Sequence, residues 1–286
     1  MVGMTSPREL LDLARALATE TGEMIEAARA SRPTVKHTKS SSIDPVTEVD
    51  IAAERHLRER LAALRPDDAV LGEEGDATTG TSGITWVLDP IDGTVNYLYG
   101  IPHYSVSVAA VSGGADPVRW TMEAGAVHEA ATGVLYSAAR GLGATKQAPG
   151  RDPERLEPRP GTELARTLLG TGFQYIAERR ALQGAVAARL LPQVRDIRRL
   201  GSCALDLCYV ADGQLDAYYE HGLNAWDFAA GALIAREAGV RVEGWDGEPP
   251  DPTFLVAALP ETFDALHRAL DEAGARTMWG SPTETV

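Results

Sequence analysis

Acidic side chains stand at the ends of several predicted strands and helices of this chain, beside glycine, proline or aromatic residues. They are, with the stretches that contain them, Asp50 (DPVTEVD), Glu73 and Glu74 (LGEEG), Asp89 and Asp92 (LDPIDGT), and Asp227 (AWDFAAG). Each stretch taken alone has an ordinary explanation. GEEG and DPIDG are typical of solvated turns. Asp227 fits the first turn of a helix, where the dipole favours an anion, and Asp50 fits a capping pattern that begins at Thr47.

Taken together, these acids indicate a metal site. Strand ends of a layered α/β protein gather at one edge, where binding sites form. Two unit charges about 4 Å apart repel by roughly 4 kcal/mol at an effective dielectric of 20, so converging carboxylates need protons or cations. Carboxylate oxygens favour Mg²⁺ or a similar hard ion. The six histidines are scattered without the paired spacing of a zinc site.

Composition limits the possible partners. The 286 residues are 44% hydrophobic, and a formal net charge of −14 disfavours nucleic acid and anionic membranes. Cys203 and Cys208 share one apolar stretch, and we expect no disulfide between them. No apolar run approaches the about 18 residues of a membrane span, and the N-terminus lacks the apolar region of a signal peptide. We therefore expect a cytoplasmic protein whose partners are small molecules.

The elements that must position the acids differ between the two halves. Helices are predicted at about 7–28, after an S-x-x-E capping box that starts at Ser6, and at about 47–64. The polar residues 31–46 between them have little to bury, and we expect a mobile loop. Strands follow as far as about residue 145, in a pattern typical of an antiparallel meander. Within 104–111, alternation places Tyr104, Val106 and Val108 on one face and the serines on the other.

The Pro-, Gly- and charge-rich residues 147–161 are the best candidate for a domain boundary. We therefore predict an N-terminal α+β domain, 1–148, that carries most of the metal-binding motifs. A C-terminal α/β domain, 149–286, would carry the substrate pocket and the last metal ligand. Strands and helices alternate in this second half, which favours α/β layering.

Five separated blocks resemble the signature blocks of the inositol monophosphatase family, and in particular its bacterial inositol-1-monophosphatase branch. They are DPVTEVD, GEEG, WVLDPIDGTVNYLYGIPHYSVSVA, RRLGSCALDLCYVADGQLDAYYE and GLNAWDFAAGALIAREAG. The resemblance covers roughly residues 8–272, in the family's order and approximate spacing. It implies a layered αβαβα sandwich of the sugar-phosphatase type, with a mixed N-terminal sheet and a smaller C-terminal α/β part. It also implies a homodimer and lithium-sensitive, Mg²⁺-dependent hydrolysis of phosphomonoesters.

The resemblance implies two Mg²⁺ sites and a weaker third. Glu73, Asp89 and the backbone carbonyl of Ile91 would hold one ion. Asp89, Asp92 and Asp227 would hold a second, and the third would lie near Glu73. The lysine-bearing loop at 36–42 would be a mobile flap beside this third site.

The resemblance also assigns catalytic and substrate-binding residues. Thr94 and Asp50 would take a proton from the attacking water, with Glu73 as the third catalytic residue. Backbone amides of Gly93 and Thr94 would receive the phosphate, and Ile91, Asp92 and Asp227 would also contact the substrate. The alcohol's hydroxyls would meet Gly201, Ser202, Cys203 and Glu220, together with Arg198. Cys203 departs from the small residue usual in the family, which would narrow the pocket if its side chain faces the substrate.

Three alternatives qualify this interpretation. Related branches act on fructose 1,6-bisphosphate, histidinol phosphate or nucleotide phosphates, although Glu220 suits a polyol better than an adenine, and we favour myo-inositol 1-phosphate. Haloacid dehalogenase phosphatases carry Asp-x-Asp at a strand end, whereas Asp89 and Asp92 are three apart. A non-catalytic regulatory homologue is the third alternative, against which the intact Asp50 and Thr94 argue.

Overall fold

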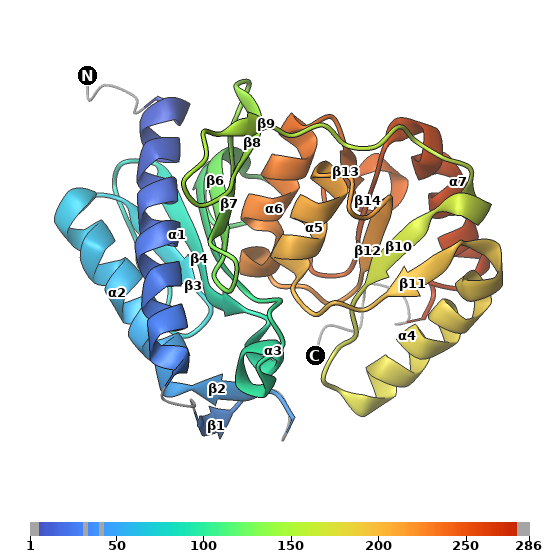
Figure 1. The fold of residues 1–286 in the computed structure, drawn as a ribbon, viewed down its shortest axis with the longest axis horizontal. Helices are drawn as coiled ribbons and strands as arrows, with labels where there is room; N and C mark the ends of the chain where they lie inside the picture. The colour runs from blue at the N-terminus through green and yellow to red at the C-terminus, as the bar shows by residue number, and fades with distance from the viewer. Residues whose placement is uncertain (1–5, 31–33, 40–42, 279–286) are drawn as a thin grey trace.

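Five layers of secondary structure lie side by side in the computed structural model, which describes residues 6–30, 34–39 and 43–278 (Figure 1). A helix pair, a seven-stranded sheet, a second helix pair, a five-stranded sheet and a last helical layer follow one another across the molecule. This arrangement confirms the predicted layered α/β sandwich.

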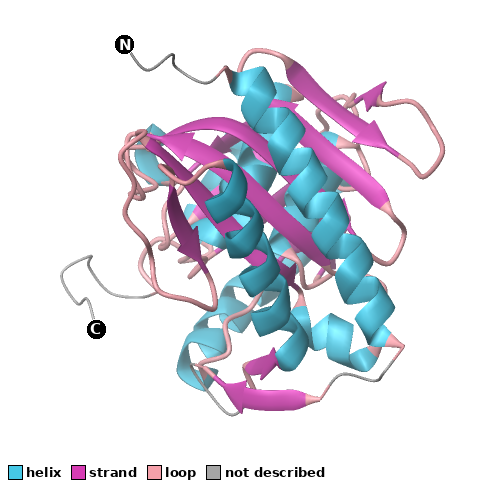
Figure 2. Ribbon diagram, turned by 90° about the vertical axis from the view of Figure 1, so that its left-hand side faces the viewer, coloured by secondary structure: helices cyan, strands magenta, loops and turns pink. Residues whose placement is uncertain are grey.

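The first layer consists of α1 (Pro7–Arg29) and α2 (Glu48–Leu64). Ser6 accepts a hydrogen bond from the backbone of Glu9, whose side chain returns one to the Ser6 backbone, so the predicted capping box is present. Leu10, Leu17 and Ile25 line one buried stripe of α1. Both helices lie against the strands of the larger sheet in Figure 2, and apolar side chains fill the space between them.

The seven-stranded sheet has the order β3-β4-β5-β6-β7-β8-β9. Its strands are β3 (Ala69–Gly72), β4 (Ile84–Asp92), β5 (Ser105–Ser112), β6 (Thr121–Glu129), β7 (Val134–Ala139), β8 (Gly143–Gln147) and β9 (Glu154–Arg155). Only β3 and β4 are parallel, and the rest form the predicted antiparallel meander. Val106 and Val108 pack toward α1, while Ser107 bonds to the backbone of α6 on the other side, so the predicted alternation is confirmed.

The middle layer is made of α5 (Cys203–Ala211) and α6 (Ala225–Glu237). Their side chains belong to one apolar cluster with Val87 and Ala109 of the larger sheet and with Tyr218 and Leu255 of the smaller one. Two helices from the second half of the chain thus cover a sheet from the first half. The strand β9 also lies within 147–161, so pairing to the larger sheet continues into the predicted boundary segment.

The five-stranded sheet has the order β11-β10-β12-β14-β13. Its strands are β10 (Leu168–Thr171), β11 (Asp196–Arg198), β12 (Ala217–Glu220), β13 (Arg241–Glu243) and β14 (Leu255–Ala258). Its outer face packs on α4 (Ala177–Leu190) and α7 (Pro260–Glu272). Short helical turns complete the chain, namely α3 (Thr94–Tyr99), η1 (Leu164–Arg166), η2 (Leu191–Gln193) and η3 (Trp245–Gly247). None of the described helices combines the length and apolar character needed to cross a bilayer.

The expectation of a loop at 31–46 is wrong in part. The strands β1 (Val35–Thr38) and β2 (Pro45–Thr47) form an antiparallel pair, and the Lys39 amide continues it with a bond to the Asp44 carbonyl at 3.0 Å. All four residues of β1 are exposed, so no apolar alternation marked the strand in the sequence. Residues 40–42 of the predicted flap lie outside the described residues.

Candidate active site

Two parallel strands bring the first acids together. The register aligns Gly72 of β3 with Leu88 of β4, and the Glu73 amide bonds to the Leu88 carbonyl at 3.2 Å. Glu73 therefore lies beside Asp89 at the carboxyl end of both strands. The pairing of β4 with β5 shifts between Asp89 and Asp92, where Pro90 offers no amide to the ladder.

Helix starts bring two further acids to the same edge. The Asp92 carboxylate oxygen Oδ2 accepts hydrogen bonds from Ser202 Oγ at 2.6 Å and from the Ala204 amide at 2.7 Å, at the start of α5. Asp227 lies in the first turn of α6, where its Oδ2 accepts from the Asn224 amide at 2.6 Å. The capping explanation of Asp227 is thus correct, and its carboxyl group also reaches the acid cluster, since its charge acts on Asp89.

A cavity of about 410 Å³ collects nearly all of the residues assigned from the sequence. Those on its wall are Glu73, Asp89, Ile91, Asp92, Gly93, Thr94, Gly201, Ser202, Cys203, Glu220 and Asp227. They lie on or directly beside β3, β4, α3, α5, β12 and α6, so both halves of the chain contribute. Asp50 lies behind this wall, fully buried, and reaches the cavity through Thr94.

The carboxyl groups of the cavity have raised pKa values, so they bind protons more readily than exposed carboxyl groups do. Burial raises the pKa of Glu73 to about 7, against the attraction of Lys39. Burial also raises the pKa of Asp89 and of Asp227 well above their usual range, and repulsion from Glu73 and Asp92 adds to both shifts. When all four acids are ionised, the single positive charge of Lys39 therefore compensates only part of their negative charge. This donor set, made of hard oxygens at one buried edge, suits a divalent cation.

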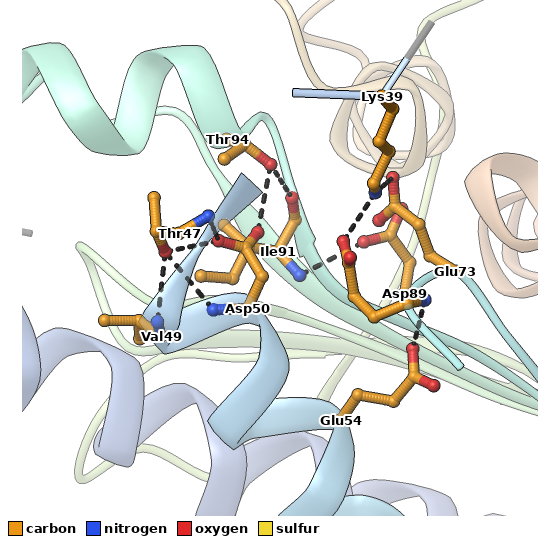
Figure 3. Close-up of polar contacts among 10 residues, drawn as sticks. Lys39, Thr47, Val49, Asp50, Glu54, Glu73, Asp89, Ile91 and Thr94 are labelled. Carbon is orange, nitrogen blue, oxygen red and sulfur yellow. Dashed lines mark hydrogen bonds and ion pairs between the residues drawn. The ribbon is translucent and has the colours of Figure 1, made fainter. Parts of the chain in front are cut away.

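Lys39 supplies one positive charge to this cluster (Figure 3). Its Nζ donates to Glu73 Oε1 at 2.7 Å and to Glu74 Oε1 at 2.5 Å. Although burial acts to lower the pKa of Lys39, the two glutamates raise it above its usual range. Within the described residues, no three His, Cys, Asp or Glu side chains are already arranged around a point as metal ligands. The acids are close enough to repel one another, and the Lys39 ammonium offsets part of the negative charge at Glu73.

Asp50 and Thr94 form a second polar group beside the acids (Figure 3). Asp50 Oδ2 accepts from the Thr47 amide at 2.9 Å and from the Thr47 hydroxyl, so the capping explanation also holds. Its other oxygen, Oδ1, lies 3.1 Å from Thr94 Oγ1. The Thr94 hydroxyl also lies 3.0 Å from the Ile91 carbonyl, and its single proton serves one acceptor at a time. Burial raises the pKa of Asp50, and the bonds from Thr47 oppose that shift.

Gly93 shapes the turn between β4 and α3. Its φ of 98° lies in the left-handed region, which side chains disfavour. A Cβ at this position would lie 3.0 Å from the His103 carbonyl oxygen and 3.2 Å from that of Gly201. Glycine is therefore required both by the turn and by the close approach of the chain to the cavity floor.

The structure corrects the assignment of Arg198 as a residue that contacts the alcohol. Arg198 is exposed, donates to Asp196 Oδ2 at 2.6 Å and does not line the cavity, whereas Arg199 does. Successive residues of an extended segment point to opposite sides, so the arginine next to the predicted one faces the cavity. Cys203 is 5% exposed on the cavity wall, and burial raises the pKa of its thiol well above the usual range.

Several other cavity residues were not assigned a role from the sequence. Gln174, Tyr175 and Arg179 come from the loop and first turn around the start of α4, and Asp206 from the first turn of α5. Outside the cavity, Glu54 of α2 accepts the Glu74 amide at 2.7 Å and so fixes the turn after β3. Asp206 lies within the block that runs from Arg198 to Glu220, but its role there was not assigned. The other residues lie in no recognisable motif, and only the fold brings them to the acids.

Comparisons with known proteins find relatives along nearly the whole chain. The model of the inositol monophosphatase family matches residues 6–281. The inositol-1-monophosphatase of Mycobacterium leprae (strain TN) is 48% identical over 280 residues, which cover 92% of this chain and 94% of that protein. The Nus factor SuhB of Pasteurella multocida (strain Pm70) is 39% identical over 255 residues, covering 88% and 91%. The solved structure of Mycobacterium tuberculosis SuhB has a TM-score of 0.81 and 46% identity, covering 96% of this chain and 100% of that one.

Proposed function

Because the chain belongs to the inositol monophosphatase family, a family of phosphatases, we propose that it hydrolyses myo-inositol 1-phosphate or a similar polyol phosphate with Mg²⁺. The observation that carries this proposal is the meeting of Glu73, Asp89, Asp92 and Asp227 in one cavity. Their raised pKa values fit a site that needs a cation before all four acids can be ionised.

The assignment of ligands follows from the resemblance and is compatible with the geometry. Glu73, Asp89 and the Ile91 carbonyl would hold one Mg²⁺, and Asp89, Asp92 and Asp227 a second, with a weaker third near Glu73. When bound, these ions would supply Lewis-acid chemistry that lowers the pKa of a water molecule and stabilises the leaving alkoxide. Lys39 must leave Glu73 before the third position can be filled.

Thr94 and Asp50 would accept the proton of the attacking water. The Thr94 hydroxyl passes its own proton to Asp50 Oδ1, and the threonine oxygen can then accept one from water. Asp50 keeps its orientation during this transfer because Thr47 holds its other oxygen. The amides of Gly93 and Thr94 would bind the phosphate, close to Asp92.

Glu220 is the feature that favours a polyol. Its carboxyl group lines the cavity, and burial raises its pKa to about 7. A carboxylate accepts hydrogen bonds from neighbouring hydroxyls, which a polyol offers and an adenine does not. The name of the Mycobacterium leprae relative, inositol-1-monophosphatase, points the same way.

Phosphate release from a panel of phosphomonoesters tests the proposal. The panel holds myo-inositol 1-phosphate, fructose 1,6-bisphosphate, histidinol phosphate and adenosine 3′,5′-bisphosphate, each with Mg²⁺ and with EDTA. We expect Mg²⁺-dependent release, and the highest kcat/KM for myo-inositol 1-phosphate. If none of these compounds released phosphate in Mg²⁺, the proposal would fail and a non-catalytic role would be the alternative. The relative named Nus factor SuhB motivates that alternative. Lithium inhibition and a homodimer stay predictions of the resemblance, and a cytoplasmic location stays a prediction from the composition of the chain.

A further inference from the structure

Arg199 is a cavity residue that the proposed mechanism does not use. It follows β11 directly and lines the cavity, whereas the preceding Arg198 pairs with Asp196 and does not line it. In the described part of the chain, no hydrogen bond or ion pair holds its guanidinium group. The other cavity cations differ in this respect, since Lys39 bonds to two glutamates and Arg179 to Gln174.

The guanidinium group lies over a glycine of the cavity wall. A Cβ at Gly201 would lie 2.5 Å from Arg199 Nη1 and 2.9 Å from Asn96 Nδ2. The absence of a side chain at Gly201 therefore makes room for Arg199 against the loop that leads into α5. Asn96 fixes that loop, because its amide donates to the Leu200 carbonyl at 2.8 Å.

Glu220 is the acidic counterpart of Arg199 in the same cavity. The charge of Arg199 acts on the Glu220 carboxyl group, yet no ion pair within 4 Å joins the two. The buried Tyr218, two residues earlier on β12, donates its hydroxyl proton to Glu220 Oε2 and fixes the acceptor in place. Glu220, an acceptor fixed by Tyr218, and Arg199, a donor without a partner among the described residues, thus line the same cavity without pairing with each other.

We propose that Arg199 is a specificity-determining residue that donates hydrogen bonds to the hydroxyl oxygens of the leaving alcohol. Those hydroxyls in turn donate hydrogen bonds to the Glu220 carboxylate, so the pair selects alcohols with neighbouring hydroxyl groups. A guanidinium group has five N–H donors in a fixed planar arrangement, which suits two adjacent oxygens. This inference rests on the proposed phosphatase function and deepens it.

Arg199→Ala tests the inference, with Arg198→Ala as the matched control. Both changes remove one exposed arginine, but only the first removes a cavity residue. With myo-inositol 1-phosphate, we expect Arg199→Ala to lower kcat/KM by about tenfold to a hundredfold, the range for hydrogen bonds to charged groups, mainly through KM. With p-nitrophenyl phosphate, whose leaving group has no hydroxyl substituents, and for Arg198→Ala with either substrate, we expect changes within about twofold. Arg199→Lys should recover part of the loss.

The outcomes separate the inference from the proposed function. Wild-type protein that releases phosphate from neither substrate would overturn the proposed function itself. Active wild-type protein with equal losses on both substrates, or with equal effects of the two alanine variants, would overturn the role of Arg199. A larger loss on fructose 1,6-bisphosphate than on myo-inositol 1-phosphate would overturn the polyol assignment, because Arg199 would then serve a second phosphate. Thermal melting of each variant checks that the fold is intact.

Discussion

Lys39 and Glu73 form an ion pair of 2.7 Å, measured from Nζ to Oε1, between a two-stranded hairpin and the carboxyl end of β3. The pair places a cation of the chain itself among the predicted metal ligands. A metal ion near Glu73 must compete with this ammonium group.

Replacing Lys39 by Gln should therefore tighten Mg²⁺ binding. We expect a Kd lower by about tenfold, which corresponds to about 1.4 kcal/mol of competition removed. Isothermal titration calorimetry of the purified protein measures it. Lys36→Gln is the control, because Lys36 pairs with the exposed Glu48 at 3.7 Å, away from the cavity. An unchanged or weaker Kd in Lys39→Gln would show that Lys39 does not compete with the metal.

Asp92→Asn and Asp50→Asn should separate metal binding from proton transfer. Asp92→Asn should abolish activity and weaken Mg²⁺ uptake, since it removes a ligand. Asp50→Asn should lower kcat by about 10²- to 10⁴-fold, the range for general-base catalysis, and leave uptake nearly unchanged. Phosphate-release kinetics and calorimetry on both variants provide the two readouts. Full activity in both variants would contradict the site assignment.

The stability of the metal-free protein should fall as the pH rises from about 4.5 to about 7. The folded-state pKa of Glu73 is raised to about 7 from an ordinary 4.5, so the folded protein binds more protons than the unfolded chain in this window. Stability then decreases with pH as those protons are lost. Because other groups titrate in the same range, the test is the difference in melting temperature between wild type and Glu73→Gln across pH. A difference that does not vary with pH would contradict the raised pKa.

Mg²⁺ should have the opposite effect on that pH dependence. Its ligands must be ionised, so the ion binds more tightly as the pH rises and stabilises the folded state by mass action. We expect the Mg²⁺-induced rise in melting temperature to be larger at pH 8 than at pH 5. Equal rises at the two pH values would indicate binding away from the buried acids.

Gly93→Ala should cost more stability than Gly114→Ala. Both glycines have positive φ, at 98° and 102°, and an alanine there stores about 1–3 kcal/mol of backbone strain. At Gly93 the added Cβ also meets the His103 carbonyl at 3.0 Å, whereas nothing lies within 4 Å at Gly114. Urea unfolding should show the larger loss for Gly93→Ala, together with reduced phosphate release. Equal losses of stability in the two variants would mean that the contact of the added Cβ with the His103 carbonyl costs nothing.

Local patterns predicted much of this architecture. The capping box at Ser6, the alternation from Tyr104 to Val108 and the turn at Gly93 depend on neighbours within a few residues, and the structure contains all three. The acids of the cavity were recognisable because each ends a regular element. Their ordinary explanations are also correct at Asp50 and Asp227, where one carboxyl group caps a helix and also belongs to the site.

The remaining features depend on long-range contacts. The ion pair of Lys39 with Glu73 joins residues 34 positions apart, and β1 has no buried face that periodicity could reveal. Which of Arg198 and Arg199 lines the cavity depends on the direction of the chain after β11, and the sequence does not specify that direction. Glu54 bonds to the Glu74 amide and Tyr218 to Glu220 from buried positions. Nothing in the sequence distinguishes these two residues from others in a helix or a strand.

The placement of α5 and α6 between the two sheets has a consequence for fragments of this protein. Their apolar side chains pack on both sheets at once. Cutting the chain within 147–161 would therefore leave one apolar face of the larger sheet exposed to solvent. Neither piece would hold a complete set of acids, since Asp227 belongs to the second piece and Asp89 to the first. Expressed separately, the two pieces should aggregate, and only their co-expression should reassemble a working enzyme.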